Sequence, residues 1–467
     1  MENQPKPDLP IKILQFGEGN FIRAFVDWLV DNLNEKASYN SGVAVIQPID
    51  KGLVEILSDQ DCLYHHLIQG LENGQKVDDI RLITCIKKAI NPFKNEESFY
   101  ALGTSSEVKL IFSNTTEAGI AFDEFDFPSD NLSKTFPGKL VQLLQLRFEK
   151  LGNTPQSELA IIPCELIESN GDRLKTCIEQ YINLWELGKN FNSWVNQRVH
   201  FANTLVDRIV PGYPKDEIES IRPRIGFDDR LVVKSESFHF FVIEGDEFIQ
   251  SNFPAHKHGF NVKYVKSIVP YRTQKVRILN GAHTCMVPIG LLAGIETVRD
   301  VVEDVQIGNF IRATIYDEII DTIQIPDGNP VEFAEQVLSR FQNPYIRHEL
   351  TSISLNSISK WKVRILPTVI DYVSKNGQLP KRLTFSLACL IKFYLSEEFQ
   401  IKDDQKVLDF FDSLKSEANE QIVHKVLSNH NFWNMDLTQL KGMSKAINIY
   451  FEKISVSSIR SILINIK

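Results

Sequence analysis

The sequence has few cysteines, no excess of positive charge and no long hydrophobic run. Its six cysteines are scattered through 467 residues without a CxxC pair, which excludes a disulfide-stapled secreted scaffold and favours a cytoplasmic protein. Lysine and arginine total 51 against 60 aspartate and glutamate residues, a net charge of −9. This balance argues against a nucleic-acid partner, because nucleic-acid-binding domains are usually basic.

Segments for export or membrane insertion are also not evident. Residues 1–10 lack the apolar core of a signal peptide. The longest uncharged run, between Arg277 and Glu296, is interrupted by Asn280, His283 and several glycines, and it is short for a span of about 20 apolar residues. We interpret this run as a buried helix whose polar residues need a separate explanation, and we expect no membrane partner.

The apolar pattern changes along the chain. Up to about residue 265, short apolar runs alternate with helical patterns, as in a mostly parallel sheet with crossover helices; beyond it, helical patterns dominate. Strands are expected at 11–16, 43–46, 80–85, 108–112, 159–162, 231–233 and 238–243. Helices are expected at 21–33, 275–292, 331–341, 363–373, 383–394 and 407–414. The sequence thus predicts an α/β domain at 1–265 and a mainly α-helical domain at 266–467.

A glycine-containing turn links the first expected strand to the first expected helix. Gly17 and Gly19 allow a tight turn, in which backbone N–H groups at a helix N-terminus can approach a pyrophosphate. Position 22 is Ile22, so the GxGxxG dinucleotide fingerprint is incomplete, and paired glycines also occur in purely structural turns. The strand before the turn and the helix after it favour a phosphate site.

The end of the second strand normally distinguishes NAD from NADP. An acid there accepts the ribose hydroxyls of NAD, whereas a basic residue favours the extra phosphate of NADP. Here the strand is followed by Gln47, with Asp50 and Lys51 close behind, so these residues alone leave the choice open.

Three polar residues, Lys275, Asn280 and His283, lie on the otherwise apolar helix that opens the second half. With about 100° per residue, His283 lies roughly 80° and Asn280 roughly 140° around the axis from Lys275, so all three can line one side of a cleft. A partly desolvated lysine can exchange a proton with a hydroxyl or alkoxide near neutral pH, while the amide and the imidazole donate hydrogen bonds to the same oxygen. The alternative is a solvated lysine, an asparagine at a helix bend and a core histidine.

Three motifs occur in an order and at spacings that resemble one family. GxGxFxR at 17–23, VDRI at 206–209 and KxxxxNxxH at 275–283 are similar to motifs of the polyol-specific long-chain dehydrogenases, the mannitol dehydrogenase family. Longer segments resemble its hexuronate branch: ILQFGEGNFIRAFVDW, SNTTEAGI, IIPCELIESNG, NTLVDRIVPGYP and KVRILNGAHT. The resemblance covers most of the chain and is thinner after about residue 370.

The resemblance implies a Rossmann-type domain that binds NAD, a helical domain after it, catalysis in the cleft between them, and no metal. It implies Lys275 as general acid or base, Asn280 and His283 as the groups that hold the reacting oxygen, and Asp207 as a residue that positions the substrate. The cofactor-binding residues expected at the glycine turn and after strand 108–112 are Gln15, Phe16, Gly17, Glu18, Gly19, Asn20, Phe21, Arg23, Asn114, Thr115, Thr116 and Glu117.

One position departs from the family pattern. The mannitol-oxidising members carry a CDN segment whose asparagine gives a second hydrogen bond to the reacting oxygen, whereas this sequence has Cys164, Glu165 and Leu166. Leu166 cannot donate that bond, so Asn280 would act more alone unless Glu165 or a backbone group compensates. The same departure resembles the hexuronate branch and argues against a simple polyol.

A hexuronate substrate requires a cation for its carboxylate. Lys360 is our candidate, because the family places a substrate-binding arginine near this position. Lys362, Arg364 and Arg272 are alternatives, and such cations also commonly form a solvated helix face. Asp207 and the arginine that follows it could likewise be an ion pair at a domain junction.

Two histidine pairs suggest metal ligands at first sight. His65-His66 and His256-x-His258 have no third ligand at a recognisable spacing, so we assign no metal.

The function expected from these residues and the resemblance is NAD-dependent, reversible reduction of D-tagaturonate to D-altronate in hexuronate (galacturonate) breakdown. Reduction of fructuronate and oxidation of a mannitol-type polyol are alternatives of the same class. A non-catalytic dinucleotide sensor is an alternative of another class, although a sensor has no need of a proton donor such as Lys275.

Overall fold

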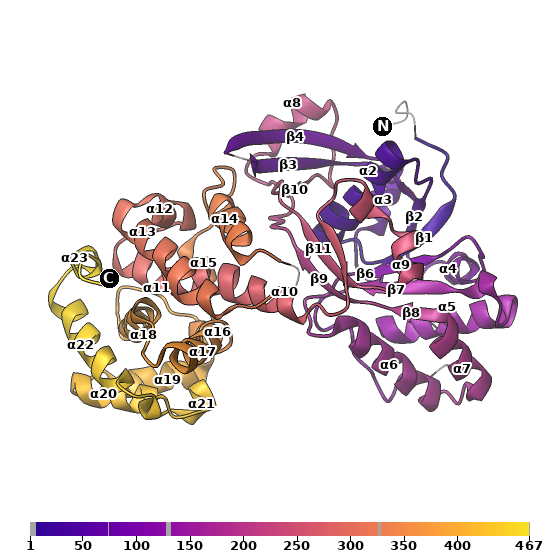
Figure 1. Ribbon diagram of the computed structural model, residues 1–467. Coiled ribbons are helices and arrows are strands. Elements are labelled where there is room, and N and C mark those ends of the chain that lie inside the picture. The colour runs from indigo at the N-terminus through magenta and orange to yellow at the C-terminus, as the bar shows by residue number, and fades with distance from the viewer. Residues whose placement is uncertain (1–5, 73, 128–131, 326–327, 467) are drawn as a thin grey trace. The chain divides into compact units, whose positions relative to one another are not determined.

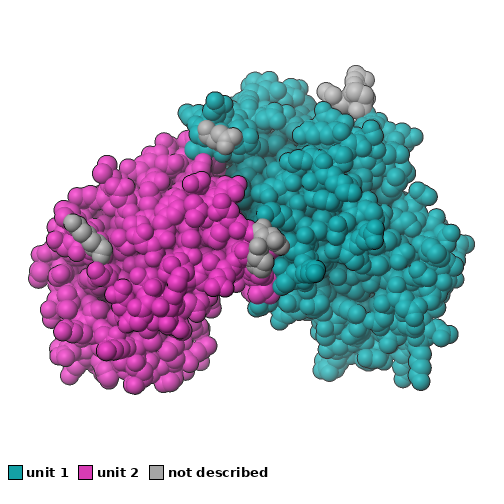
Figure 2. All heavy atoms as spheres, viewed as in Figure 1, with its two compact units in different colours: residues 1–268 teal, residues 269–467 magenta. Residues whose placement is uncertain are grey.

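The chain forms two compact units, residues 1–268 and 269–467, coloured separately in Figure 2. The computed structural model describes residues 6–72, 74–127, 132–325 and 328–466. In the described parts of the chain, no helix combines the length and the apolar character needed to cross a membrane.

Unit 1 is built on a six-stranded parallel sheet (Figure 1). Its strands are β1 (Ile11–Phe16), β2 (Gly42–Ile46), β5 (Ile86–Ile90), β6 (Leu110–Ser113), β7 (Leu159–Pro163) and β8 (Val199–Phe201). They lie in the order β5-β2-β1-β6-β7-β8. Counted along the chain among these strands, this is the 3-2-1-4-5-6 order of the Rossmann fold, so the expected α/β fold class is confirmed. The strand order reverses at β1, between β2 and β6.

Both faces of this sheet are covered by helices. Ile13 packs in one apolar cluster and Leu14 in the other, because successive side chains of a strand point to opposite faces. The first cluster includes residues of α2 (Trp28–Ala37) and α3 (Val54–Asp59). The second includes residues of α4 (Glu96–Gly103), α5 (Phe136–Leu151), α6 (Asn170–Leu184) and α7 (Gly188–Arg198). Burial on both sides explains why the inner strands β2, β6 and β7 are apolar runs.

Two smaller sheets complete unit 1. One contains β3 (Tyr64–Glu72), β4 (Gln75–Ile83) and β10 (Val233–Ser235), and the other contains β9 (Asn203–Asp207), β11 (Phe240–Glu244) and β12 (Val262–Val265). Helix α8 (Ile218–Ile225) lies between β9 and β10, and α9 (Glu247–Asn252) lies between β11 and β12. Unit 1 also has 3₁₀ turns at Pro155–Ser157, before β7, and at Ala255–Lys257. The expected strand 80–85 is corrected here. Residues 80–83 end β4, which pairs antiparallel with β3, and β5 supplies the parallel strand instead.

The first helical run begins at Asn20 and contains a π-helical segment. Three residues of α1 (Asn20–Ile22) are followed by the π-segment Arg23–Asp27 and then by α2. Asp27 in this segment is buried, and its Oδ2 accepts hydrogen bonds from the Tyr64 hydroxyl at 3.0 Å and from Gln15 Nε2 at 3.4 Å. Burial raises the pKa of Asp27 from 3.8 to about 7.

Asp27→Asn is expected to stabilise the protein at pH 8 relative to wild type, and less so at pH 5. Because the folded pKa of Asp27 exceeds the unfolded one, the folded state holds the extra proton between pH 3.8 and about 7. The contribution of Asp27 to stability therefore falls as pH rises through that window. Urea unfolding should give the variant a free energy of unfolding that exceeds the wild-type value by up to about 4 kcal/mol at pH 8 and by less at pH 5. A pH-independent difference would contradict the assignment.

Unit 2 is helical and is organised around α11 (Gly281–Leu292), in which every residue from Gly281 to Leu291 is buried. The helices that pack around α11 are α12 (Val298–Glu303), α13 (Val305–Ala313), α15 (Leu350–Ile353), α16 (Ser357–Arg364) and α18 (Lys381–Tyr394). The interpretation of this uncharged run as a buried helix is thus confirmed. The remaining α-helices are α10 (Val269–Gln274), α14 (Pro330–Phe341), α17 (Leu366–Asn376), α19 (Gln405–Leu414), α20 (Asn419–Leu427), α21 (His430–Trp433), α22 (Met443–Val456) and α23 (Ile459–Leu463).

Two expected helices of unit 2 differ in detail. The expected single helix 363–373 is two helices, α16 and α17, that meet at Ile365, whose φ is −115°. Pro367 lies in the first turn of α17, where it lacks the N–H that a continuous helix would need. The expected α-helix 275–292 is π-helical over Lys275–Asn280 and α-helical only from Gly281. Further π- and 3₁₀-segments lie at Thr314–Ile319, Ile320–Thr322 and Leu437–Gln439.

Candidate active site

The carboxyl ends of β1 and β6 meet where the strand order reverses. Phe16 pairs with Ser113, and the Asn114 N–H donates to the Phe16 carbonyl at 2.9 Å. Gly17 has a φ of +111°, and a Cβ there would lie 2.7 Å from the Asn114 carbonyl oxygen, so a side chain does not fit. The structure therefore brings together the glycine turn and the strand end that the sequence indicated separately. In open α/β sheets, ligands bind in this crevice.

Gly19 differs from Gly17 because it faces open space. It adopts a φ of −65° and precedes the helical run that begins at Asn20. A Cβ at Gly19 would have no described heavy atom within 4 Å. Because no side chain covers the turn at Gly19, a ligand can approach the N–H groups at the start of the helical run. Such N–H groups bind a pyrophosphate well.

Two residues expected at the cofactor lie behind the turn instead of on its surface. Arg23 is 2% exposed, and its guanidinium donates to the Glu18 carbonyl at 3.0 Å and to Asn20 Oδ1 at 2.9 Å. Gln15 is fully buried and donates to the Gly17 carbonyl at 3.2 Å. Both side chains fix the shape of the turn.

Among the residues expected at the cofactor, the two phenylalanines pack against other aromatic rings, whereas the exposed residues are polar. Phe16 packs against Phe136 with ring centroids 4.9 Å apart, and Phe21 stacks on Phe25 at 5.1 Å. At the strand end, Thr116 and Glu117 are exposed, while Asn114 and Thr115 are half-buried.

The loop after β2 is tied to the glycine turn by an acid. Glu18 is buried and its Oε1 accepts the Leu53 N–H at 3.1 Å; burial raises the pKa of this carboxyl. Gln47 donates to the carbonyls of Ile49 and Asp50, both at 2.8 Å. The Gln47 amide group thus holds the loop together, and Glu18 is the carboxylate beside it.

Glu165 is directed into the protein. Its Oε1 accepts from the Thr115 N–H and hydroxyl, each at 2.9 Å, and its Oε2 accepts from the Ser113 hydroxyl at 3.0 Å. Burial raises the pKa of this carboxyl. Leu166 is 66% exposed. Glu165 therefore positions the loop after β6, and its contacts provide no replacement for the hydrogen bond that Leu166 cannot make.

Asp207 and Arg208 lie at the end of β9 and are both 5% exposed. The Arg208 guanidinium donates to the carbonyls of Ala24 at 2.8 Å and Glu236 at 3.0 Å. It also lies over the Trp28 ring, 4.3 Å from the centroid. Burial lowers the pKa of Arg208 to about 9.

In unit 2, the π-helical segment changes the relation between Lys275 and Asn280. A π-turn closes over five residues instead of four, so each residue turns by less than the 100° of an α-helix. Lys275 and Asn280, the two ends of the segment, therefore lie closer to one face than the roughly 140° expected for an α-helix. π-Segments within helices are frequent at functional sites.

The imidazole of His283 is held by two rings from other segments. It stacks on Phe341 with centroids 4.4 Å apart and an interplanar angle of 27°, and it meets His348 edge-on at 5.0 Å. Burial lowers the pKa of His348, which favours its neutral form. No motif in the sequence links Phe341 or His348 to His283, so sequence reasoning missed both.

Helix α16 carries the cations Lys360 and Arg364 and packs against α11, the helix that carries His283. Arg364 Nη1 lies 3.4 Å from the hydroxyl oxygen of Thr284, which itself donates to the Asn280 carbonyl at 2.8 Å. Lys360 Nζ donates to the Ile353 carbonyl at 2.8 Å. Burial lowers the pKa of both cations.

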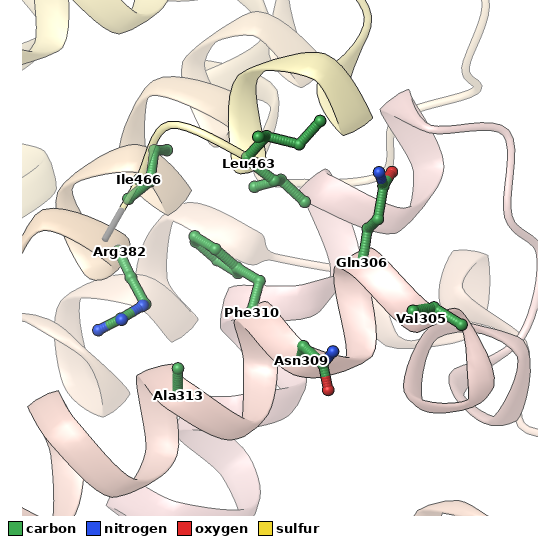
Figure 3. Close-up of a pocket in the computed structure, with 9 residues that line it drawn as sticks. Val305, Gln306, Asn309, Phe310, Ala313, Arg382, Leu463 and Ile466 are labelled. Carbon is green, nitrogen blue, oxygen red and sulfur yellow. The ribbon is translucent and has the colours of Figure 1, made fainter.

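A separate pocket of about 260 Å³ lies in unit 2, lined from α13, α18 and α23 (Figure 3). Phe310, Leu463 and Ile466 make it largely apolar. Its cation, Arg382, lies 3.1 Å from Asp317 Oδ2. None of the residues expected from the sequence at the active site lines this pocket.

Unit 1 has a Rossmann sheet with an open glycine turn where the strand order reverses. Unit 2 has a lysine, an asparagine and a histidine on one helical run. This combination is the architecture of a dinucleotide-dependent oxidoreductase. The comparisons with known proteins agree. Residues 11–257 match the mannitol dehydrogenase Rossmann domain, and residues 267–455 match the mannitol dehydrogenase C-terminal domain. The chain belongs to the mannitol dehydrogenase family.

Relatives of known name match over nearly the full length. The chain is 42% identical to altronate oxidoreductase of Bacillus subtilis (strain 168), over 95% of this chain and 93% of that protein. It is 41% identical to altronate oxidoreductase of Bacteroides thetaiotaomicron, over 97% and 96%.

Solved structures share the fold at low sequence identity. A substrate-free D-sorbitol dehydrogenase has a TM-score of 0.82 at 19% identity, over 97% of this chain and 95% of that one. Mannitol 2-dehydrogenase of Pseudomonas fluorescens, solved with NAD and D-mannitol, has a TM-score of 0.67 at 17% identity, over 98% and 94%.

Proposed function

We propose that this protein catalyses the NAD-dependent, reversible reduction of D-tagaturonate to D-altronate in hexuronate breakdown. The observation that carries the proposal is full-length identity of about 40% to altronate oxidoreductases, together with Lys275, Asn280 and His283 on one helical run. All six cysteines are buried free thiols, which supports a reducing compartment such as the cytoplasm.

NAD is the proposed cofactor, held by unit 1. Gly19 leaves the helix N-terminus open to the pyrophosphate, and Asn114 to Glu117 line the neighbouring strand end. Glu18 lies beside the β2 loop, where its side chain accepts the Leu53 N–H, and an acid near this loop is typical of sites that bind NAD. When bound, the nicotinamide supplies or accepts the hydride.

Unit 2 supplies the proton transfer. Lys275 Nζ gives its proton to the alkoxide that forms as the ketone is reduced, and takes it back in the reverse direction. Asn280 and His283 donate hydrogen bonds to the same oxygen and stabilise its developing charge. The Phe341 stack fixes the orientation of the His283 ring, so less reorganisation is needed during the reaction.

Asp207 and the α16 cations are assigned to substrate binding. Asp207 is proposed to accept hydrogen bonds from substrate hydroxyls. A carboxylate group at one end of the hexuronate requires a cation, for which Lys360 and Arg364 are the candidates on α16.

A substrate panel tests this proposal. NADH oxidation is followed with D-tagaturonate, D-fructuronate, D-fructose and no sugar. We expect rapid oxidation with tagaturonate and a specificity constant at least about tenfold lower for each alternative. A higher specificity constant for fructuronate or fructose would identify that sugar as the substrate instead. If the protein binds NADH but turns over none of these sugars, the alternative function of a dinucleotide sensor would be supported.

A further inference from the structure

We infer that Arg364 is the residue that binds the substrate carboxylate, and thereby selects hexuronates over uncharged ketoses. This inference rests on the proposed function, because a hexuronate differs from the corresponding ketose by that carboxylate. The evidence lies entirely within unit 2: the place of Arg364 beside the catalytic helix, its hydrogen-bonding partners, and the contacts of neighbouring cations.

The position of Arg364 is fixed by close packing of α16 on the helix that carries Asn280 and His283. A Cβ added at Gly281 would lie 3.4 Å from the Arg364 carbonyl oxygen, so the two backbones approach closely there. From this point the guanidinium reaches Thr284, the residue that follows His283. The cation therefore lies at Thr284, one turn after Asn280 on the same helical run.

The guanidinium of Arg364 has unused donor capacity. Its one hydrogen bond to a described residue is the 3.4 Å contact with Thr284, and no described carboxylate lies within ion-pairing distance of it. The side chain is half-buried, so water compensates it incompletely. A planar guanidinium with two free donor sites matches a carboxylate in a bidentate geometry.

The neighbouring cations are engaged elsewhere or point elsewhere. Lys360 donates to the Ile353 carbonyl, and Arg277 is 2.5 Å from Asp371 Oδ2. Lys362 lies about 160° around the helix from both Lys360 and Arg364, at about 100° per residue. It is therefore directed away from the side of α16 that carries the other two.

Thr284 connects the carboxylate site to the reacting oxygen. Its hydroxyl accepts from Arg364 and donates to the Asn280 carbonyl. A hexuronate held by Arg364 at its carboxylate would thus be bound close to the asparagine proposed to hold its ketone oxygen. This arrangement gives Arg364 a role in substrate affinity more than in the chemical step.

The test is a comparison of Arg364→Gln, Arg364→Lys and the control Lys362→Gln on tagaturonate and on fructose. Arg364→Gln removes the charge and retains a donor for Thr284. We expect its kcat/KM for tagaturonate to fall about 30-fold to 1000-fold, mainly through KM. Arg364→Lys should recover part of the loss, and Lys362→Gln should match the wild type within about twofold.

The discriminating readouts are the fructose activity and chemical rescue. Activity of Arg364→Gln on fructose should stay within about threefold of wild type, since fructose has no carboxylate, and guanidinium chloride at low millimolar concentration should restore turnover of tagaturonate in Arg364→Ala. An unchanged KM for tagaturonate in Arg364→Gln, or equal losses on both sugars, would overturn the assignment. A wild-type enzyme that does not prefer tagaturonate would instead overturn the proposed function.

Discussion

Lys275→Ala should lower the turnover of tagaturonate by a factor of about 10²–10⁴, the usual contribution of a positioned general acid or base. The affinity for NADH should stay nearly unchanged, because the proposed cofactor-binding residues belong to unit 1. Steady-state turnover and fluorescence titration with NADH measure the two quantities on one preparation. Lys266→Ala is the control, since Lys266 is an exposed lysine outside the proposed site, and it should behave as wild type.

Chemical rescue sharpens this test. A small primary amine such as methylamine should restore part of the turnover of Lys275→Ala, because it can occupy the space of the missing side chain and carry the proton. If the alanine variant keeps more than about a tenth of wild-type turnover, a different group donates the proton.

Gly19→Val should weaken cofactor binding while the fold survives. A Cβ at Gly19 meets no described atom of the protein within 4 Å, so we expect the added side chain to clash with a ligand that approaches the turn before it clashes with the protein. We expect the Kd for NADH to rise at least about tenfold, with a midpoint of thermal unfolding within a few degrees of wild type. A normal NADH titration of the folded variant would place the cofactor elsewhere.

Gly17→Ala is the contrasting variant. Its Cβ would lie 2.7 Å from the Asn114 carbonyl oxygen at a φ of +111°, so this change acts on the fold itself. It should lower the free energy of unfolding by about 1–3 kcal/mol. Comparison of Gly19→Val with Gly17→Ala distinguishes two causes of lost NADH binding. The first variant blocks the cofactor with a side chain, and the second distorts the turn.

The Rossmann domain was largely predictable, because its signals are local. The inner strands β2, β6 and β7 are buried on both faces and so are apolar runs, and the expected strand 11–16 coincides with β1. The turn at Gly17 follows directly from that strand. By contrast, the expected strand 80–85 missed the antiparallel hairpin of β3 and β4, in which Glu72 pairs with Gln75, although the Asn-Gly step at 73–74 is a local hairpin signal in the sequence.

The helical unit shows the same division. Lys275, Asn280 and His283 were found because polar residues on an apolar helix require an explanation, but the π-helical turn that brings the first two closer has no periodicity signal. Pro367 was a readable signal for the break between α16 and α17, and the expected helix 363–373 overlooked it. Phe341 and Arg364 reach the site from other helices, so only the tertiary structure relates them to it.

The most direct test of the proposed reaction is deuterium transfer from NADH labelled with deuterium at both C4 positions. With D-tagaturonate as substrate, we expect the product to be D-altronate with one deuterium on the carbinol carbon that was the ketone, observed by mass spectrometry and NMR. The proton on the new hydroxyl should come from solvent. Formation of a different epimer, an unlabelled product or no product would contradict the account.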